Sequence, residues 1–124
     1  MLLNLSDISS EPLQQQIIRQ IRAKILTSDL EAGTDLPSIR VFAREHHVSV
    51  ITVKLAYENL EREGLIHSRR GKGFFVSKIE KENRIMMAEK RLSENLTPLI
   101  KAAKSEGLST KDILKIIEKI LNEN

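Results

Sequence analysis

The sequence has no cysteine and no tryptophan, only three prolines and five glycines, and an aromatic content of 3% in 124 residues. The absence of cysteine excludes disulfide bonds, thiolate metal sites and a thiol nucleophile. The scarcity of aromatic residues indicates a core of Ile, Leu and Val packed mainly between helices. A core of this size is marginal alone, so association with a second copy would stabilise it. No apolar run approaches the roughly 18 residues that span a bilayer, so no membrane partner is expected.

Catalytic and cofactor-binding patterns are also missing. No carboxylate pair, catalytic triad or metal-ligating set stands out, and Gly71-Lys72-Gly73 lacks the spacing and the following Ser or Thr of a P-loop. His46 and His47 are adjacent, so their side chains point apart on a helix. The sequence therefore predicts a protein that is not an enzyme and holds neither a metal nor another cofactor. The acidic and polar residues near Met1 do not fit a signal peptide, and the cytoplasm is the expected location.

Positive charge is concentrated in two stretches, although the net charge is only +3. The stretch from Gly64 to Ile79 contains basic residues and no acidic one, and the stretch from Leu36 to Tyr57 has Glu45 as its single acid. Such a distribution is typical of a bounded phosphate-binding face. Ordinary solvated charge is the alternative interpretation.

The first part of the chain predicts an arm followed by an amphipathic helix. Residues 1–9 alternate loosely and indicate an arm or a short strand. Ser10 is placed to cap a helix that has Pro12 near its first turn and ends near Thr27. Its apolar stripe repeats every four residues, at Leu13, Ile17, Ile21 and Ile25.

Two short helical patterns follow, separated by a tight turn. Ser38 is a good N-cap for a helix that runs to about His46, and Ser49 caps the next helix after a turn at His47-Val48. The second of these helices has a buried stripe and a terminating Gly64, its apolar positions being Val53, Ala56, Tyr57 and Leu60. The pattern predicts a helix-turn-helix.

A basic hairpin is predicted immediately after these helices. Leu65-Ile66-His67 and Phe74-Phe75-Val76 favour strands, and the residues between them form a turn with glycines and three cations. Glycine lets a backbone approach a phosphate or a groove floor, and the cations supply the attraction. A helix-turn-helix followed at once by a basic hairpin predicts a winged DNA-binding domain.

The composition changes after Ser77, and a helical tail is predicted. Pro98 is expected to kink or interrupt the first tail helix. Ser109 and Asp112 form a capping box that starts the last one. The tail helices have more apolar surface than the chain can cover, so we expect an antiparallel pair that dimerises. The residues expected at this interface are Ile85, Met86, Leu92, Leu96, Leu99, Ile113, Ile116, Ile117 and Ile120.

The fold class that these patterns predict is mainly α with a small β-hairpin. The winged helix-turn-helix domain would occupy residues 1–77, and the two-helix dimerisation tail residues 78–124.

The residues of the first part match a known family in register. The matching positions are Pro12-Leu13, Gln16-Ile17, Leu30-x-x-Gly33, Leu36-Pro37-Ser38-x-Arg40, Val48-Ser49, Thr52-Val53, Ala56-Tyr57, Leu60, Glu63-Gly64-Leu65-Ile66 and Gly71-Lys72-Gly73-x-Phe75-Val76. This run, about half of the chain, resembles the GntR winged-helix family of bacterial transcription regulators. The short tail is similar to that of the YtrA-type subfamily, which implies a homodimeric repressor of an operon, often one encoding a transporter, bound to a palindromic operator in double-stranded DNA.

The resemblance implies roles for individual residues. Arg40 matches a residue that contacts DNA, Ser49 and Thr52 match positions that bond phosphates or base edges, and Lys54 lies on the groove side. The hairpin tip matches the wing that approaches the minor groove. The candidate DNA-contacting residues are Arg40, Ser49, Val50, Thr52, Lys54, Arg69, Arg70, Gly71, Lys72 and Gly73.

Three positions depart from the family pattern. Val50 stands where the family often has Arg, and Ile51 beside it is apolar, so either could pack against a thymine methyl. Phe74 replaces a common Thr and could alter the wing. His47 replaces a frequent Gly in the turn, at a position suited to positive φ.

Two other functions compete with a specific repressor. The winged helix could be a protein–protein module without specific DNA binding, although such a module has no need of a cationic hairpin tip. A non-specific architectural DNA binder is the other alternative, which the modest net charge disfavours. The sequence does not identify an effector; with no separate effector domain, any ligand would bind at the dimer interface or between tail and winged helix.

Overall fold

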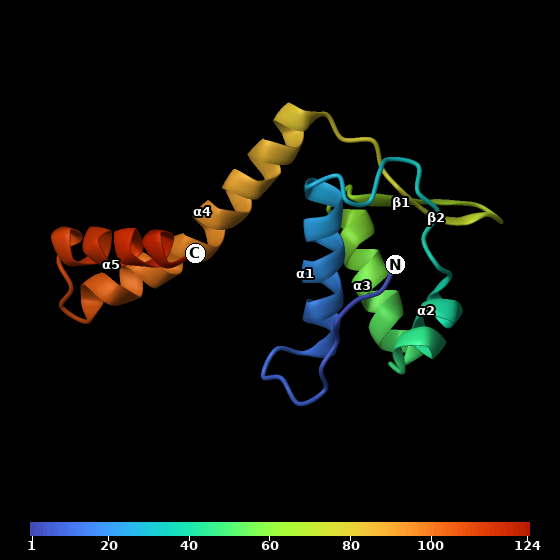
Figure 1. The fold of residues 1–124 in the computed structure, drawn as a ribbon, viewed down its shortest axis with the longest axis horizontal. Helices are drawn as coiled ribbons and strands as arrows, with labels where there is room; N and C mark the ends of the chain where they lie inside the picture. Colours follow the sequence, from blue (N-terminus) through green and yellow to red (C-terminus); the bar gives the residue numbers. More distant parts are fainter. The chain divides into compact units, whose positions relative to one another are not determined.

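The computed structural model describes residues 1–124, which divide into two compact units, Met1–Arg84 and Ile85–Asn124. Five helices and one antiparallel hairpin follow in sequence (Figure 1): α1 (Leu13–Leu26), α2 (Ile39–His46), α3 (Val50–Arg62), β1 (Ile66–Arg69), β2 (Gly73–Val76), α4 (Lys81–Ser105) and α5 (Thr110–Glu123). The predicted fold class is confirmed: the protein is mainly helical, with a hairpin directly after the helix-turn-helix. No helix combines the length and the apolar content that a membrane span requires.

Helix α1 begins later than the sequence predicted, and Ser10 does not cap it. Pro12 occupies the N-cap position and makes no side-chain cap. The reason is steric. The ring of Pro12 disfavours helical backbone angles at the preceding residue, Glu11, so the helix does not start there. Ser9, not Ser10, accepts a hydrogen bond from the Glu11 N–H. The predicted apolar stripe is confirmed, since Ile17, Ile21 and Ile25 are buried in the core.

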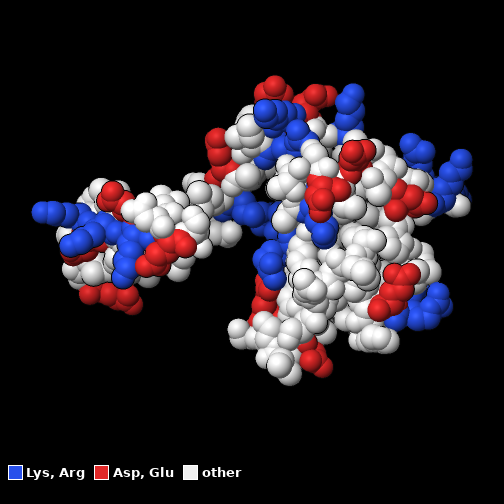
Figure 2. Space-filling view, in the orientation of Figure 1, with Lys and Arg blue, Asp and Glu red and all other residues white.

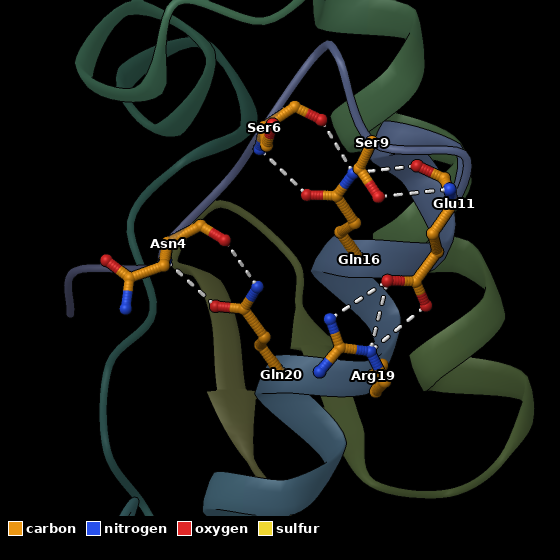
Figure 3. A network of polar contacts seen from close by, with 7 residues as sticks. All are labelled: Asn4, Ser6, Ser9, Glu11, Gln16, Arg19 and Gln20. Carbon is orange, nitrogen blue, oxygen red and sulfur yellow. Dashed lines mark hydrogen bonds and ion pairs between the residues drawn. The ribbon is translucent and has the colours of Figure 1, made fainter.

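Residues 1–9 form an arm and no strand, because glutamine side chains on α1 bond the arm backbone (Figure 3). The Gln16 amide accepts from the Ser6 N–H at 2.9 Å and donates to the carbonyls of Ser6 at 2.8 Å and Glu11 at 2.7 Å. The Gln20 amide likewise accepts from the Asn4 N–H at 2.9 Å and donates to its carbonyl at 2.7 Å. Each side-chain amide thus makes the pair of backbone hydrogen bonds that a neighbouring strand would otherwise make with the arm. The side chain of Gln16 is buried, and both of its polar atoms are hydrogen-bonded.

The arm also contacts the helix-turn-helix through His46. Its Nε2 accepts a hydrogen bond from the Leu3 N–H at 3.3 Å, and its Nδ1 lies 3.1 Å from the Phe42 carbonyl. A carbonyl can only accept and a backbone N–H can only donate, so Nδ1 is the donor and Nε2 the acceptor in this arrangement. The histidine is therefore a structural contact between α2 and the arm.

The core of the first unit lies where α1 packs on α3 and α2 closes one end (Figure 1). Tyr57 is fully buried there, and its hydroxyl donates to the Pro37 carbonyl at 2.8 Å. Burial raises the pKa of the Tyr57 phenol, so the group stays protonated and remains a donor. Arg22 on α1 pairs with Glu63 at 2.8 Å and connects α1 to the end of α3.

Helix α4 continues through Pro98, so of the two expected effects, a kink or an interruption, the interruption does not occur. Proline removes the N–H that would bond the Glu94 carbonyl, but Glu94 is exposed, so water can satisfy that oxygen. Thr97 also donates its hydroxyl to the Ser93 carbonyl at 2.7 Å, within the same turn. The helix ends at Ser105, before Gly107 with its φ of 100°.

Helix α5 starts with the predicted capping box. The Ser109 hydroxyl accepts from the Asp112 N–H at 3.1 Å, and the Asp112 carboxylate accepts from the Ser109 N–H at 2.9 Å. The hydrogen bond from the Ser109 backbone lowers the pKa of Asp112 below its ordinary value. No side chain of either tail helix is fully buried, and the most sheltered apolar ones are Met87, Leu96, Ile100, Ala103, Ile113 and Ile117.

Candidate nucleic-acid interface

The turn between α2 and α3 is built by short-range contacts that the sequence signalled. Ser38 caps α2 by accepting from the Val41 N–H at 3.2 Å. The helix ends at His46, and the C-cap residue His47 has φ 54° and ψ 45°, the left-handed conformation expected at this position. The Val48 N–H then donates to the Ala43 carbonyl at 3.0 Å, and Ser49 begins α3. The backbone of His47, Val48 and Ser49 therefore sets the direction of α3 relative to α2.

The first turn of α3 combines free donors with two hydroxyls. The Ser49 hydroxyl accepts from the Thr52 N–H at 3.1 Å and lies 2.7 Å from the Thr52 hydroxyl. The first helical bond is donated by Val53 to the Ser49 carbonyl, so the N–H groups of Val50 and Ile51 have no acceptor within the helix. Free N–H groups and the positive end of the helix dipole favour an anion such as a phosphate.

The two faces of α3 have different composition. Val53, Ala56, Tyr57 and Leu60 are buried, as predicted. The outward face exposes Lys54 and three apolar side chains, whose exposed fractions are 42% for Val50, 62% for Ile51 and 42% for Leu55. Sequence reasoning overlooked Leu55, although its spacing of one helical turn from Ile51 places the two on one side.

Helix α2 also exposes cations. Arg40 and Arg44 are both exposed and lie one helical turn apart, so they share one side of α2. Figure 2 shows Lys and Arg side chains over α2 and, separately, at the tip of the β1–β2 hairpin. Both groups of cations lie along the same edge of the view, with acidic side chains between them.

The hairpin presents its cations at a tight turn. Its register pairs Arg69 with Gly73, and the Lys72 N–H donates to the Arg69 carbonyl at 2.9 Å. Gly71 has φ 75°, which a glycine adopts without strain. Every residue from Arg69 to Gly73 is exposed. The Arg69 guanidinium lies 4.9 Å from the centre of the Phe75 ring, and this cation–π contact holds it along the hairpin.

Three connections fix the hairpin to the helices. The Ser68 N–H and hydroxyl both donate to the Glu61 carboxylate on α3, at 3.1 and 2.8 Å. On the other edge of β2, the Leu36 N–H donates to the Phe74 carbonyl at 2.9 Å, which joins the segment before α2 to the wing. The Phe74 ring packs edge-on against Tyr57 with centroids 5.1 Å apart. Phe74 therefore lies toward the core rather than at the hairpin tip, and no local sequence signal indicates the Glu61–Ser68 contact.

The candidate residues thus fall into two exposed or half-exposed groups on the first unit. One lies on the helix-turn-helix and comprises Arg40 on α2 and Ser49, Val50, Thr52 and Lys54 at the start of α3. The other is the hairpin tip, Arg69 to Gly73. Both combine cations with accessible backbone and neither contains a carboxylate, which is the composition of a surface that binds phosphate.

Comparisons with known proteins agree with this geometry. The family model described as "Bacterial regulatory proteins, gntR family" matches residues 13–76. The HTH-type transcriptional repressor YtrA of Bacillus subtilis is 33% identical over 112 residues, which cover 90% of this chain and 86% of YtrA. Among solved structures, a GntR family transcriptional regulator from Listeria monocytogenes has a TM-score of 0.69 and 29% identity, covering 93% of this chain and 98% of its own. YtrA from Sulfolobus acidocaldarius, a GntR-family transcription factor, has a TM-score of 0.59 and 28% identity, covering 98% and 97%.

Proposed function

We infer the function from one premise: the chain belongs to the GntR family of bacterial regulatory proteins and is a DNA-binding transcription regulator, not an enzyme. We propose that it is a cytoplasmic repressor of an operon near its own gene, with transporter genes as the first candidates, and that it binds an inverted repeat as a homodimer. The observation that carries this proposal is the pairing, in one unit, of a helix N-terminus with free N–H groups and a basic hairpin tip. The Bacillus subtilis relative is named a repressor, which supports repression rather than activation as the proposed effect on transcription.

In this proposal α3 enters the major groove with its first turn leading. The N–H groups of Val50 and Ile51 and the hydroxyls of Ser49 and Thr52 bond phosphate oxygens, while the longer Lys54 reaches a base edge. Arg40 on α2 neutralises a neighbouring phosphate. These contacts would fix the register of the helix on the duplex.

The hairpin then occupies the flanking minor groove. Arg70 and Lys72 supply charge at its tip, and the bare backbone at Gly71 and Gly73 permits a close approach. Arg69, held against Phe75, is directed along the hairpin toward the phosphates beside it. The Glu61–Ser68 contact would keep this wing at a fixed angle to α3.

The tail supplies the dimer. Six of the nine residues expected at the interface are exposed large side chains: Ile85, Met86, Leu92, Leu99, Ile116 and Ile120. The other three, Leu96, Ile113 and Ile117, are half-buried. We propose that residues 78–124 form the dimerisation part and residues 1–77 the DNA-binding part. A second copy would cover the exposed apolar surface and place the two α3 helices in major grooves about 34–36 Å apart.

Footprinting of the DNA upstream of the gene tests the proposal directly. The expected result is protection of two half-sites with a common sequence in opposite orientation, their centres one helical turn or a multiple of it apart. Absence of protection at physiological salt, with folded dimeric protein, would contradict a local repressor.

Substitution of two lysines separates the proposed roles of α3 and the wing. Lys54→Ala is expected to relax base preference at one position per half-site, with a loss of about 1–3 kcal/mol on the best operator. Lys72→Ala is expected to weaken binding to all sequences alike and to reduce the salt slope by about one phosphate contact per half-site. Titrations of both variants on operator and unrelated DNA at several salt concentrations measure this. Identical behaviour of the two variants would show the role assignments to be wrong.

A further inference from the structure

The outward face of α3 is unusually apolar for a surface next to DNA. Val50, Ile51 and Leu55 are all exposed, and they lie in the first two turns of the helix. Their opposite neighbours, Val53 and Ala56, fill the core, so the three exposed side chains are not needed there. Lys54 lies on the same outward face, and Arg40 is exposed on α2. The chain therefore carries a small apolar patch, defined here as Val50, Ile51 and Leu55, with a lysine beside it.

The chemistry of the major groove leaves one apolar partner for such a patch. Guanine, cytosine and adenine present hydrogen-bond donors and acceptors and no methyl group there, whereas thymine adds a C5-methyl group. An aliphatic side chain pressed against a polar base edge leaves that edge without a partner, at a cost in affinity. Against a methyl group, the same side chain gains by removing apolar surface from water.

We propose that the Val50–Ile51–Leu55 patch selects thymine in the operator half-site by contact with thymine C5-methyl groups. This inference rests on the proposed function, because it requires α3 to lie in the major groove. Lys54 and the free N–H groups of Val50 and Ile51 favour DNA over an apolar protein as the occupant, since both are complementary to phosphate. Glu58, one turn beyond Lys54 on the same outward face, repels phosphate and confines the close contact to the first two turns.

The test begins with selection of bound duplexes from randomised DNA by the full-length protein. We expect thymine to be enriched at one or more positions per half-site. Deoxyuridine is then placed at each of those positions in both half-sites. Uracil pairs like thymine and lacks only the methyl group, so the substitution isolates that contact.

The expected loss is about fourfold per contacted methyl, and about 16-fold for the symmetric pair of positions. Replacing the thymine by cytosine should weaken binding, and 5-methylcytosine should recover part of the loss, because its methyl group occupies the same place in the groove. Ile51→Ala or Leu55→Ala should abolish the difference between thymine and uracil at the position that each contacts. Lys54→Ala should weaken binding but keep that difference, and thermal melts should show all three variants folded.

The outcomes separate the two levels of the argument. Equal affinity for thymine and uracil operators, together with specific binding to the selected sequence, would overturn the thymine inference and leave the repressor proposal standing. Failure to select any sequence from random DNA would overturn the repressor proposal, and the thymine inference with it.

Discussion

Replacement of both Leu92 and Leu99 by glutamate is expected to make the protein monomeric and to lower operator affinity by about 100-fold or more. The two side chains are 64% and 67% exposed and lie seven residues apart, hence on one side of α4. Because they contribute little to packing within the chain, the helix itself should persist. Two buried charges per protomer at the proposed interface would prevent association. Operator binding would fall because each half-site would then bind independently.

A matched control adds the same charges elsewhere on the helix. Asn83→Glu with Ser105→Glu introduces two glutamates at exposed polar positions on the side of α4 opposite Leu92 and Leu99. This variant should remain dimeric and bind the operator within a few-fold of the original protein. Sedimentation equilibrium and operator titration measure both properties. A Leu92/Leu99 variant that still dimerises and binds normally would show that the second copy associates through another surface.

Tyr57→Ala is expected to destabilise the first unit by about 3–5 kcal/mol, which is enough to unfold many domains of this size. The Tyr57 ring contacts Phe42 at a centroid distance of 6.0 Å and Phe74 at 5.1 Å, and its hydroxyl bonds the Pro37 carbonyl. One residue of α3 thus joins α2, the segment before α2 and the wing. Its loss would leave a cavity where the three meet.

Two further substitutions test the origin of this effect, one at the same position and one on the outward face as a control. Tyr57→Phe removes only the hydroxyl and should cost about 1 kcal/mol. Since burial raises the phenol pKa above its ordinary value, this difference should be constant below about pH 10 and shrink at higher pH, where the unfolded chain ionises. Leu55→Ala, on the outward face, should change stability by no more than about 0.5 kcal/mol. Urea unfolding measures all three variants, and a Tyr57→Ala protein as stable as the Leu55→Ala control would refute the packing argument.

Sequence reasoning succeeded where structure depends on residues three or four apart. The caps at Ser38, Ser49 and Ser109, and the left-handed His47, are set by such local bonds, and all were predicted correctly. The start of α1 was mispredicted although the signal was local, because the restriction that Pro12 places on Glu11 outweighed the capping tendency of Ser10.

The remaining differences have tertiary causes. The sequence did not distinguish an arm from a short strand at residues 1–9. The bonds that decide between them come from Gln16 and Gln20 on α1, ten and sixteen residues away in sequence. The contact of Phe74 with Tyr57 was not predicted, because it joins residues of separate elements. Of the candidate site, the polar and basic members were found from the family pattern, and their roles remain predictions. Leu55 was missed because an apolar residue on a helix is ordinarily assigned to the core.

The division of α3 into two faces bears on how regulators of this kind diversify. No residue of the outward patch belongs to the buried stripe, so a change at Val50, Ile51 or Leu55 leaves the four buried side chains of α3 in place. After gene duplication, one copy could acquire a new operator preference by drift at these positions while its stability stayed nearly constant. The same separation makes the three positions natural choices for a combinatorial library aimed at orthogonal repressors.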